Sequence, residues 1–134
     1  IVYGAFTAGL KAGHFFNTFP LMNGDVVPDL VYSMFPAWKN LLFNPFAIQF
    51  IHRWLGVTIL IIGLYVTRVI LLIPLTRIQK ITIYTFVSTL IIQFILGVSA
   101  LVFSVPLLLG VLHQLTALIL LSVSLTLYYQ YQSS

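Results

Sequence analysis

The chain has 134 residues, of which 60% are hydrophobic and only 6% are charged, and its mean hydropathy is +1.09. About 25% of the residues of a soluble domain are charged, so this composition excludes a soluble domain and predicts an integral membrane protein surrounded by lipid. The six basic residues behind the formal net charge of +4 are scattered among apolar spans, which excludes a nucleic-acid partner. The absence of cysteine excludes disulfides and thiolate metal sites.

The first part of the chain combines an apolar segment with a polar connection. Residues 1–13 are apolar from the first position, without an initiator Met, and predict the end of a truncated helix. Residues 14–44 are rich in Pro, Asn and aromatic residues and hold both carboxylates, Asp25 and Asp29. This composition predicts an interfacial loop that can include a short helix on the membrane surface.

Three long apolar segments follow, at residues 45–73, 81–103 and 106–131. Each exceeds the roughly 20 residues that a membrane-spanning helix needs. Asn44 followed by Pro45 is typical of a helix start, and residues 74–80 read as a short basic turn. The predicted fold is therefore all-α, a membrane four-helix bundle with a truncated first helix, in one domain covering residues 1–134.

Basic residues give a weak indication of orientation. Arg68, Arg77 and Lys80 crowd the short turn, whereas the other three basic residues are spread around the 14–44 loop. Counting Lys and Arg alone is therefore not decisive. Their density near the short turn favours placing that turn in the cytoplasm, or in the matrix of a mitochondrion.

Two histidines occupy matched positions on the second and fourth segments. His52 lies seven residues after Pro45, and His113 lies seven residues after Pro106. At about 1.5 Å per residue, both lie roughly 10 Å along their helices. Because one antiparallel span separates these helices, they run parallel and place both imidazoles at one depth. A planar metallocofactor with one axial nitrogen on each side needs this arrangement.

The neighbouring residues suit such a pocket. Gly56 leaves room for a macrocycle edge one turn after His52, and Arg53 is suited to pair with anionic propionates. Gln49 and Gln114 are candidates for hydrogen bonds to the imidazoles or to the polar edge of a porphyrin. Gln93 on the third segment either faces the same pocket or makes a plain interhelical hydrogen bond.

A lone intramembrane histidine is often only a structural hydrogen-bonding group. Two at matched depth, flanked by small residues, favour bis-histidine heme binding with His52 and His113 as the iron ligands. Zinc is disfavoured because no third or fourth ligand is at hand. His14, at the loop entrance, is better suited to an interfacial or solvated role.

The same residues carry a family resemblance that covers nearly the whole chain. The segments GAFTAGLKAGHFFNTFPLM, IQFIHRWLG and VPLLLGVLHQLTA resemble the C-terminal half of heme A synthase, the CtaA-type family. The resemblance implies an eight-helix protein of two similar halves, of which this chain is helices five to eight. It also implies oxidation of the C8 methyl of heme O to a formyl group, which makes heme A for terminal oxidases.

For this half, the resemblance implies a heme b cofactor ligated by His52 and His113, with the substrate heme in the other half. It also implies that the 14–44 loop lies on the outer side of a bacterial cytoplasmic membrane or a mitochondrial inner membrane. One departure is Phe43, which stands where relatives carry an acidic residue. This chain alone is therefore expected to hold a heme without oxidising one.

Two other functions fit the residues. One is an electron-transfer subunit of the b-type cytochrome class, and the other is a structural membrane module whose histidines only tie helices together. The expected partners are heme O, an unidentified electron carrier, and either the absent N-terminal half or a second protomer.

Overall fold

The computed structural model describes residues 1–132. These residues form four α-helices and three short 3-10 helices, without a named strand among them. The α-helices are α1 (Val2–Gly9), α2 (Pro45–Ile70), α3 (Arg77–Val102) and α4 (Leu107–Gln132). The 3-10 helices, Ala12–His14, Asp29–Tyr32 and Ala37–Leu41, all lie before α2. Helices α2, α3 and α4 are each long and apolar enough to cross a membrane, so the predicted all-α membrane bundle is confirmed.

Some helix boundaries differ from those predicted. Helix α3 begins at Arg77 rather than at residue 81, so most of the predicted basic turn is helical. A capping box explains the earlier start: Thr76 Oγ1 accepts from the Gln79 N–H at 3.2 Å, and Gln79 Oε1 accepts from the Thr76 N–H at 2.9 Å. Helix α1 ends at Gly9 rather than at residue 13, because Lys11 adopts a left-handed conformation with φ 51°.

The start of α2 is fixed by a buried asparagine that also holds the preceding loop. Asn44 Oδ1 accepts hydrogen bonds from the N–H groups of Phe46 at 2.9 Å and Ala47 at 3.3 Å. Its Nδ2 donates to the Leu30 carbonyl and to Asn40 Oδ1, both at 2.8 Å. These bonds satisfy orphan donors of the first helical turn and fasten the loop to the end of α2.

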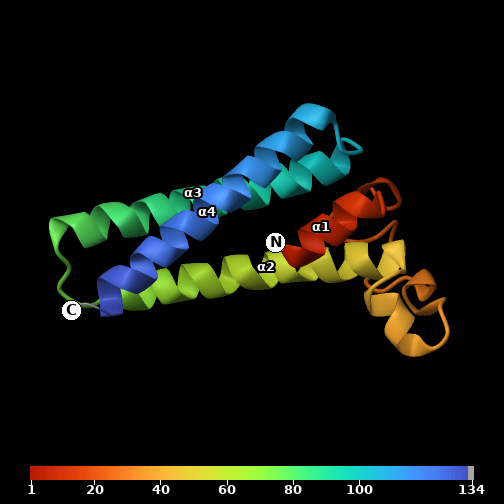
Figure 1. The fold of residues 1–134 in the computed structure, drawn as a ribbon, viewed down its shortest axis with the longest axis horizontal. Coiled ribbons are helices and arrows are strands. Elements are labelled where there is room, and N and C mark those ends of the chain that lie inside the picture. The colour runs from red at the N-terminus through yellow and green to blue at the C-terminus, as the bar shows by residue number, and fades with distance from the viewer. Residues whose placement is uncertain (133–134) are drawn as a thin grey trace.

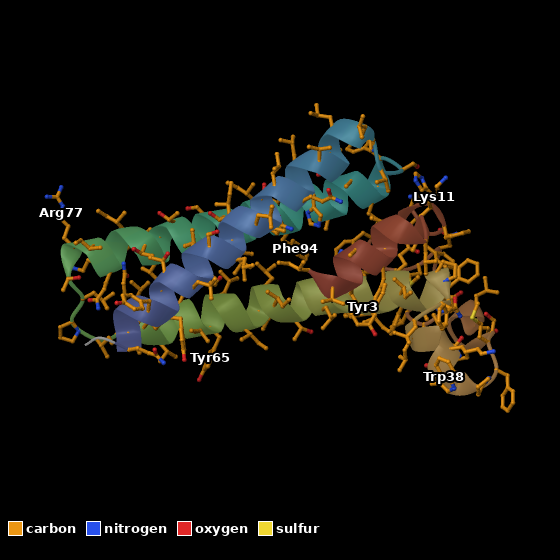
Figure 2. All side chains as sticks on the ribbon, in the orientation of Figure 1. Tyr3, Lys11, Trp38, Tyr65, Arg77 and Phe94 are labelled. Carbon is orange, nitrogen blue, oxygen red and sulfur yellow. The ribbon has the colours of Figure 1, made fainter. Side chains whose placement is uncertain are left out.

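The helices form a layered bundle with one loop-rich end (Figure 1). Helices α3 and α4 form a packed pair, and α1 lies against the first half of α2. The loop formed by residues 14–44 gathers at the end where α2 begins, and the short connection from α2 to α3 lies at the opposite end (Figure 1). In Figure 2, Trp38 and Arg77 mark these two ends.

The packing differs from that of a soluble bundle. At Gly63 of α2 an added Cβ would lie only 2.5 Å from Leu90 Cδ2, so this glycine allows α3 to approach closely. Large apolar side chains on α4 are instead directed outward, for example Leu107 with 84% of its surface exposed. Exposing apolar side chains to lipid, unlike exposing them to water, costs no free energy, so this pattern agrees with a bundle embedded in a membrane.

Candidate functional site

The structure brings the two intramembrane histidines together. The ring of His52 on α2 and the ring of His113 on α4 have centroids 6.3 Å apart, and their planes are perpendicular. His52 lies seven residues beyond the first residue of α2, and His113 lies six residues beyond the first residue of α4. Two helices that start at the same end of the bundle therefore deliver one imidazole each to a common site.

His113 is oriented by the backbone of α3. Its Nδ1 lies 3.1 Å from the carbonyl oxygen of Gln93, and its Nε2 lies 3.4 Å from Gln93 Nε2. When Nδ1 carries the proton and donates to this carbonyl, Nε2 keeps its lone pair, which is the common tautomer of metal-ligating histidine. An added Cβ at Gly97 would lie 2.8 Å from His113 Cε1, so the absence of a side chain there lets the ring reach the Gln93 carbonyl.

Small residues also surround His52. An added Cβ at Gly4 of α1 would lie 3.6 Å from His52 Cε1, which is ordinary contact, whereas one at Gly56 would meet nothing within 4 Å. Gly56, predicted to make room beside His52, therefore does border open space. The sequence indicates Gly4 as a small residue that lets helices approach closely, but does not assign it to the site, because only the folded arrangement of α1 against α2 places it beside the imidazole.

The distance between the rings fits a metal ion held between two imidazoles. A metal–imidazole bond is about 2.0 Å long, and a five-membered ring with bonds of about 1.33 Å has its centroid roughly 1.1 Å from each ring nitrogen. Two imidazoles that held one iron atom between them would have centroids about 6.2 Å apart, so the observed centroid distance of 6.3 Å leaves room for such an atom. The residues present fit a bis-histidine heme.

Arg53 is largely committed to the loop. Its Nη1 donates to the carbonyl oxygens of Thr18 at 2.7 Å and Leu21 at 3.1 Å, and its Nη2 donates to that of Phe16 at 3.1 Å. A further Nη1 contact reaches the Pro20 carbonyl at 3.2 Å. The side chain is only 8% exposed, and its buried Nε has no hydrogen-bond partner. The guanidinium therefore clamps the loop, and its Nε–H makes no hydrogen bond among the described residues.

The glutamines assigned to the site occupy different environments. Gln49 is buried and its Nε2 donates to the Phe16 carbonyl at 3.0 Å, so it supports the loop held by Arg53. Its Oε1 and that of Gln93 are buried without a hydrogen-bond partner. Gln114 is exposed on α4. Of the three glutamines, Gln93 is the one whose side chain forms a hydrogen bond with an imidazole of the site, that of His113.

A cavity of about 290 Å³ lies next to these residues. Its lining consists of Phe19, Pro20, Arg53, Trp54, Val57 and Phe94. The guanidinium carbon of Arg53 lies 5.9 Å from the centroid of the Phe19 ring, a cation–π contact. Phe94, labelled in Figure 2, follows Gln93 on α3. Arg53 thus belongs to the wall of this cavity, while its Nε is buried behind the apolar lining and has no acceptor among the described residues.

Replacing Arg53 with Met is expected to destabilise the loop, because four loop carbonyls lose their donors at once. Bonds from a charged donor contribute about 1.5–3 kcal/mol each, so thermal unfolding in detergent should shift clearly downward and proteolysis within residues 16–24 should accelerate. Arg68→Met is the matched control, since Arg68 is exposed on the same helix. Equal stability of the two variants would show that Arg53 does not clamp the loop.

Known proteins resemble this chain over most of its length. The family described as Cytochrome oxidase assembly protein matches residues 1–125. The chain therefore belongs to this family. Heme A synthase of Wolbachia pipientis from Culex pipiens is 40% identical over 90% of this chain, and that of Brucella anthropi is 41% identical over 91%. No solved structure matches the chain.

These relatives are longer than this chain. The aligned region covers 34% of the Wolbachia protein and 34% of the Brucella protein, so the chain spans about a third of the length of the curated relatives it matches. The resemblance to heme A synthase predicted from three sequence segments is confirmed by these matches.

Proposed function

We propose that this chain is the heme b-binding half of a heme A synthase, with His52 and His113 as the two axial ligands. The observation that supports the proposal best is the ring separation of 6.3 Å between imidazoles from two parallel helices. The full enzyme would oxidise the C8 methyl of heme O to a formyl group, with this half contributing the resident heme. That reaction would supply heme A to terminal oxidases, in agreement with the family's description.

Each residue of the site has a distinct task in this proposal. The Gln93 carbonyl and the space at Gly97 hold the His113 ring, so that Nε2 is presented without a proton. Gly56 leaves open space beside His52 for the edge of a planar ligand. Arg53, a residue of the wall of the adjacent cavity, would supply the positive charge that attracts an anionic propionate. A bound heme would supply a one-electron redox centre.

An electron-transfer cytochrome of the b class would use the same pair of histidines. The loop segment and the heme A synthase relatives favour the synthase. The discriminating experiment is deletion of the full-length gene followed by chromatography of extracted hemes. The proposal predicts accumulation of heme O and loss of formyl heme, both reversed by the intact gene. Unchanged heme A in the deletion strain would contradict it and favour the cytochrome.

Gly56→Leu is expected to lower heme occupancy severalfold while leaving folding intact. An added Cβ there meets nothing in the protein within 4 Å, so the larger side chain is expected to clash with the bound ligand, and overpacking costs about 1–3 kcal/mol. Heme content per protein should be measured by absorbance after purification. Gly9→Leu is the matched control, because Gly9 also has open space around its Cβ direction but lies at the end of α1. Equal heme content in the two variants would mean that Gly56 borders no heme.

The three apolar helices support a multi-pass membrane protein, and we infer from the resemblance to heme A synthase a bacterial cytoplasmic or mitochondrial inner membrane, with the 14–44 loop on the outer side. Arg77 and Lys80 belong to the first turn of α3 and are exposed near the short connection. They lie at the end opposite to the loop (Figure 1). Basic residues near a short connection favour the cytoplasmic or matrix side of the membrane for that connection.

A further inference from the structure

Helices α2 and α4 carry the two histidines but pack mainly on other elements. Helix α4 packs closely on α3, and α2 packs on α1 and α3, whereas α2 and α4 make little direct contact with each other. In a membrane the hydrophobic effect does not press helices together, so specific packing and hydrogen bonds set their positions. A slip of α4 by one residue would rotate His113 by about 100° away from His52. The separation of the two rings therefore depends on contacts made elsewhere.

The segment of residues 13–18, which follows α1, is held on one side by the helix that carries His52. Arg53, the next residue of α2, donates from Nη2 to the Phe16 carbonyl at 3.1 Å and from Nη1 to the Thr18 carbonyl at 2.7 Å. Charge-assisted hydrogen bonds of this kind are stronger than neutral ones. The 13–18 segment is therefore fixed relative to the start of α2.

The same segment is held on its other side by the end of α3. Asn17, between the two residues that Arg53 binds, donates from Nδ2 to the Leu101 carbonyl at 2.8 Å and to the Gly13 carbonyl at 2.9 Å. Leu101 is the second-last residue of α3, directly before the turn that leads into α4. The 13–18 segment thus connects the start of α2 with the turn between α3 and α4, which lies at the same end of the bundle (Figure 1).

The turn between α3 and α4 has an unusual backbone. Ser104 and Val105 both adopt left-handed conformations, with φ of 59° and 56°. This region is costly for residues other than glycine, and most of all for a β-branched residue such as valine. Such a conformation persists only where the surrounding structure holds it. Contacts of Val105 with its neighbours therefore bear on where α4 begins.

The Val105 side chain lies between the 13–18 segment and the first turns of α4. Gly13 is buried, and an added Cβ there would lie only 2.7 Å from Val105 Cγ2. On the other side, an added Cβ at Gly110 of α4 would lie 3.8 Å from Val105 Cγ1. His113 follows Gly110 by three residues, on the same face of the helix. The backbone at Gly13 is therefore in direct contact with the turn that positions the His113 helix.

We propose that Gly13, Asn17 and Val105 are positioning residues, which fix α4 relative to α2 so that His113 faces His52. They act through the backbone of the turn and do not touch the imidazoles themselves. The proposal rests on the proposed function, because it assigns these residues to the pair of heme ligands. The position of α4 can nevertheless be measured without any heme, which keeps the two proposals separable.

The test measures the distance between α2 and α4 in the purified full chain by double electron–electron resonance. The chain has no native cysteine, so spin labels can be attached specifically to Tyr65→Cys on α2 and Leu108→Cys on α4, where both residues are exposed. Heme content and the low-spin absorption spectrum are recorded on unlabelled samples of the same variants. Circular dichroism verifies that each variant is folded.

Gly13→Ala is expected to shift the distance distribution and to lower heme content about fivefold or more, because the added methyl group displaces Val105. Val105→Ala in the same chain removes Cγ2 and leaves the added Cβ 3.9 Å from Val105 Cβ, an ordinary contact. The double variant should therefore recover the original distance, spectrum and heme content. Gly9→Ala is the matched control, since an added Cβ at Gly9 meets nothing within 4 Å.

Asn17→Asp tests the hydrogen bonds independently of this methyl contact. The carboxylate keeps the shape of the side chain but cannot donate to the Gly13 and Leu101 carbonyls, so the distance distribution should shift again. Asn23→Asp is the matched control, because Asn23 is exposed and its Oδ1 accepts from Thr18, as a carboxylate oxygen also can.

A distance distribution that stays unchanged in both Gly13→Ala and Asn17→Asp would overturn the proposal, even if thermal stability falls. A shift in Gly13→Ala, or a loss of its fold, that Val105→Ala does not reverse would contradict the role of the contact between Gly13 and Val105. An unmodified chain that binds no bis-histidine heme would overturn the proposed function, whereas the distances between the labels would still decide whether these residues position α4.

Discussion

Replacing either His52 or His113 with Ala is expected to abolish the low-spin, bis-histidine absorption spectrum of the purified protein. The two rings lie 6.3 Å apart on separate helices, so each substitution removes one side of the site completely. Loss of an outer partner of a metal ligand already costs about 10–100-fold in affinity, and loss of the ligand itself should cost more. Heme content should therefore fall at least about tenfold.

His14→Ala is the matched control for these variants. His14 is exposed at the end of a 3-10 helix, and its removal should leave both the spectrum and the heme content unchanged. A low-spin spectrum that persists in His113→Ala would show that this residue does not ligate iron. A spectrum lost in all three variants would point to unfolding, which circular dichroism can detect.

The second large effect concerns activity: residues 1–134 alone are expected to bind a b-type heme and to convert no heme O. Oxidation of a methyl group requires removal of protons, and a positioned general base usually assists. The carboxylates of the chain, Asp25 and Asp29, lie in the exposed loop rather than beside the histidines. Phe43, also exposed, provides no carboxylate, at a position where the resemblance to heme A synthase implies an acidic residue.

This activity prediction is tested by supplying heme O with a redox couple to the purified chain and separating extracted hemes by chromatography. Only unreacted heme O is expected. The heme A synthase of Brucella anthropi serves as the positive control, since this relative is about three times as long as the aligned region. Hydroxylated or formyl heme made by residues 1–134 alone would show that this half is catalytic by itself.

The lengths of the apolar segments and the residues typical of helix starts made the fold predictable from the sequence. The Asn44–Pro45 start of α2 is observed as predicted, because an amide cap and a proline act locally. The predicted start of α3 at residue 81 is wrong, because Arg77 and Lys80 belong to the helix and not to the turn before it. The Thr76–Gln79 capping box, which overrides that reading, is itself visible in the sequence.

The juxtaposition of His52 and His113 was also accessible from the sequence, because both follow a helix start at nearly equal distances. The partners of Arg53 were not, since its acceptors are carbonyl groups of an irregular loop. Backbone carbonyls occur at every position and carry no sequence signal. For the same reason the contact between His113 and the Gln93 carbonyl appears only in the folded structure.

The measurement that tests heme ligation by His52 and His113 most directly is electron spin echo spectroscopy of the heme in protein grown with isotope-labelled histidine. Ligation by both residues predicts a low-spin ferric signal with nitrogen couplings from two histidine imidazoles, and one of these couplings should be missing from the heme that remains when either His52 or His113 is replaced. A five-coordinate, high-spin signal, or coupling to a single imidazole in the unmodified chain, would contradict it.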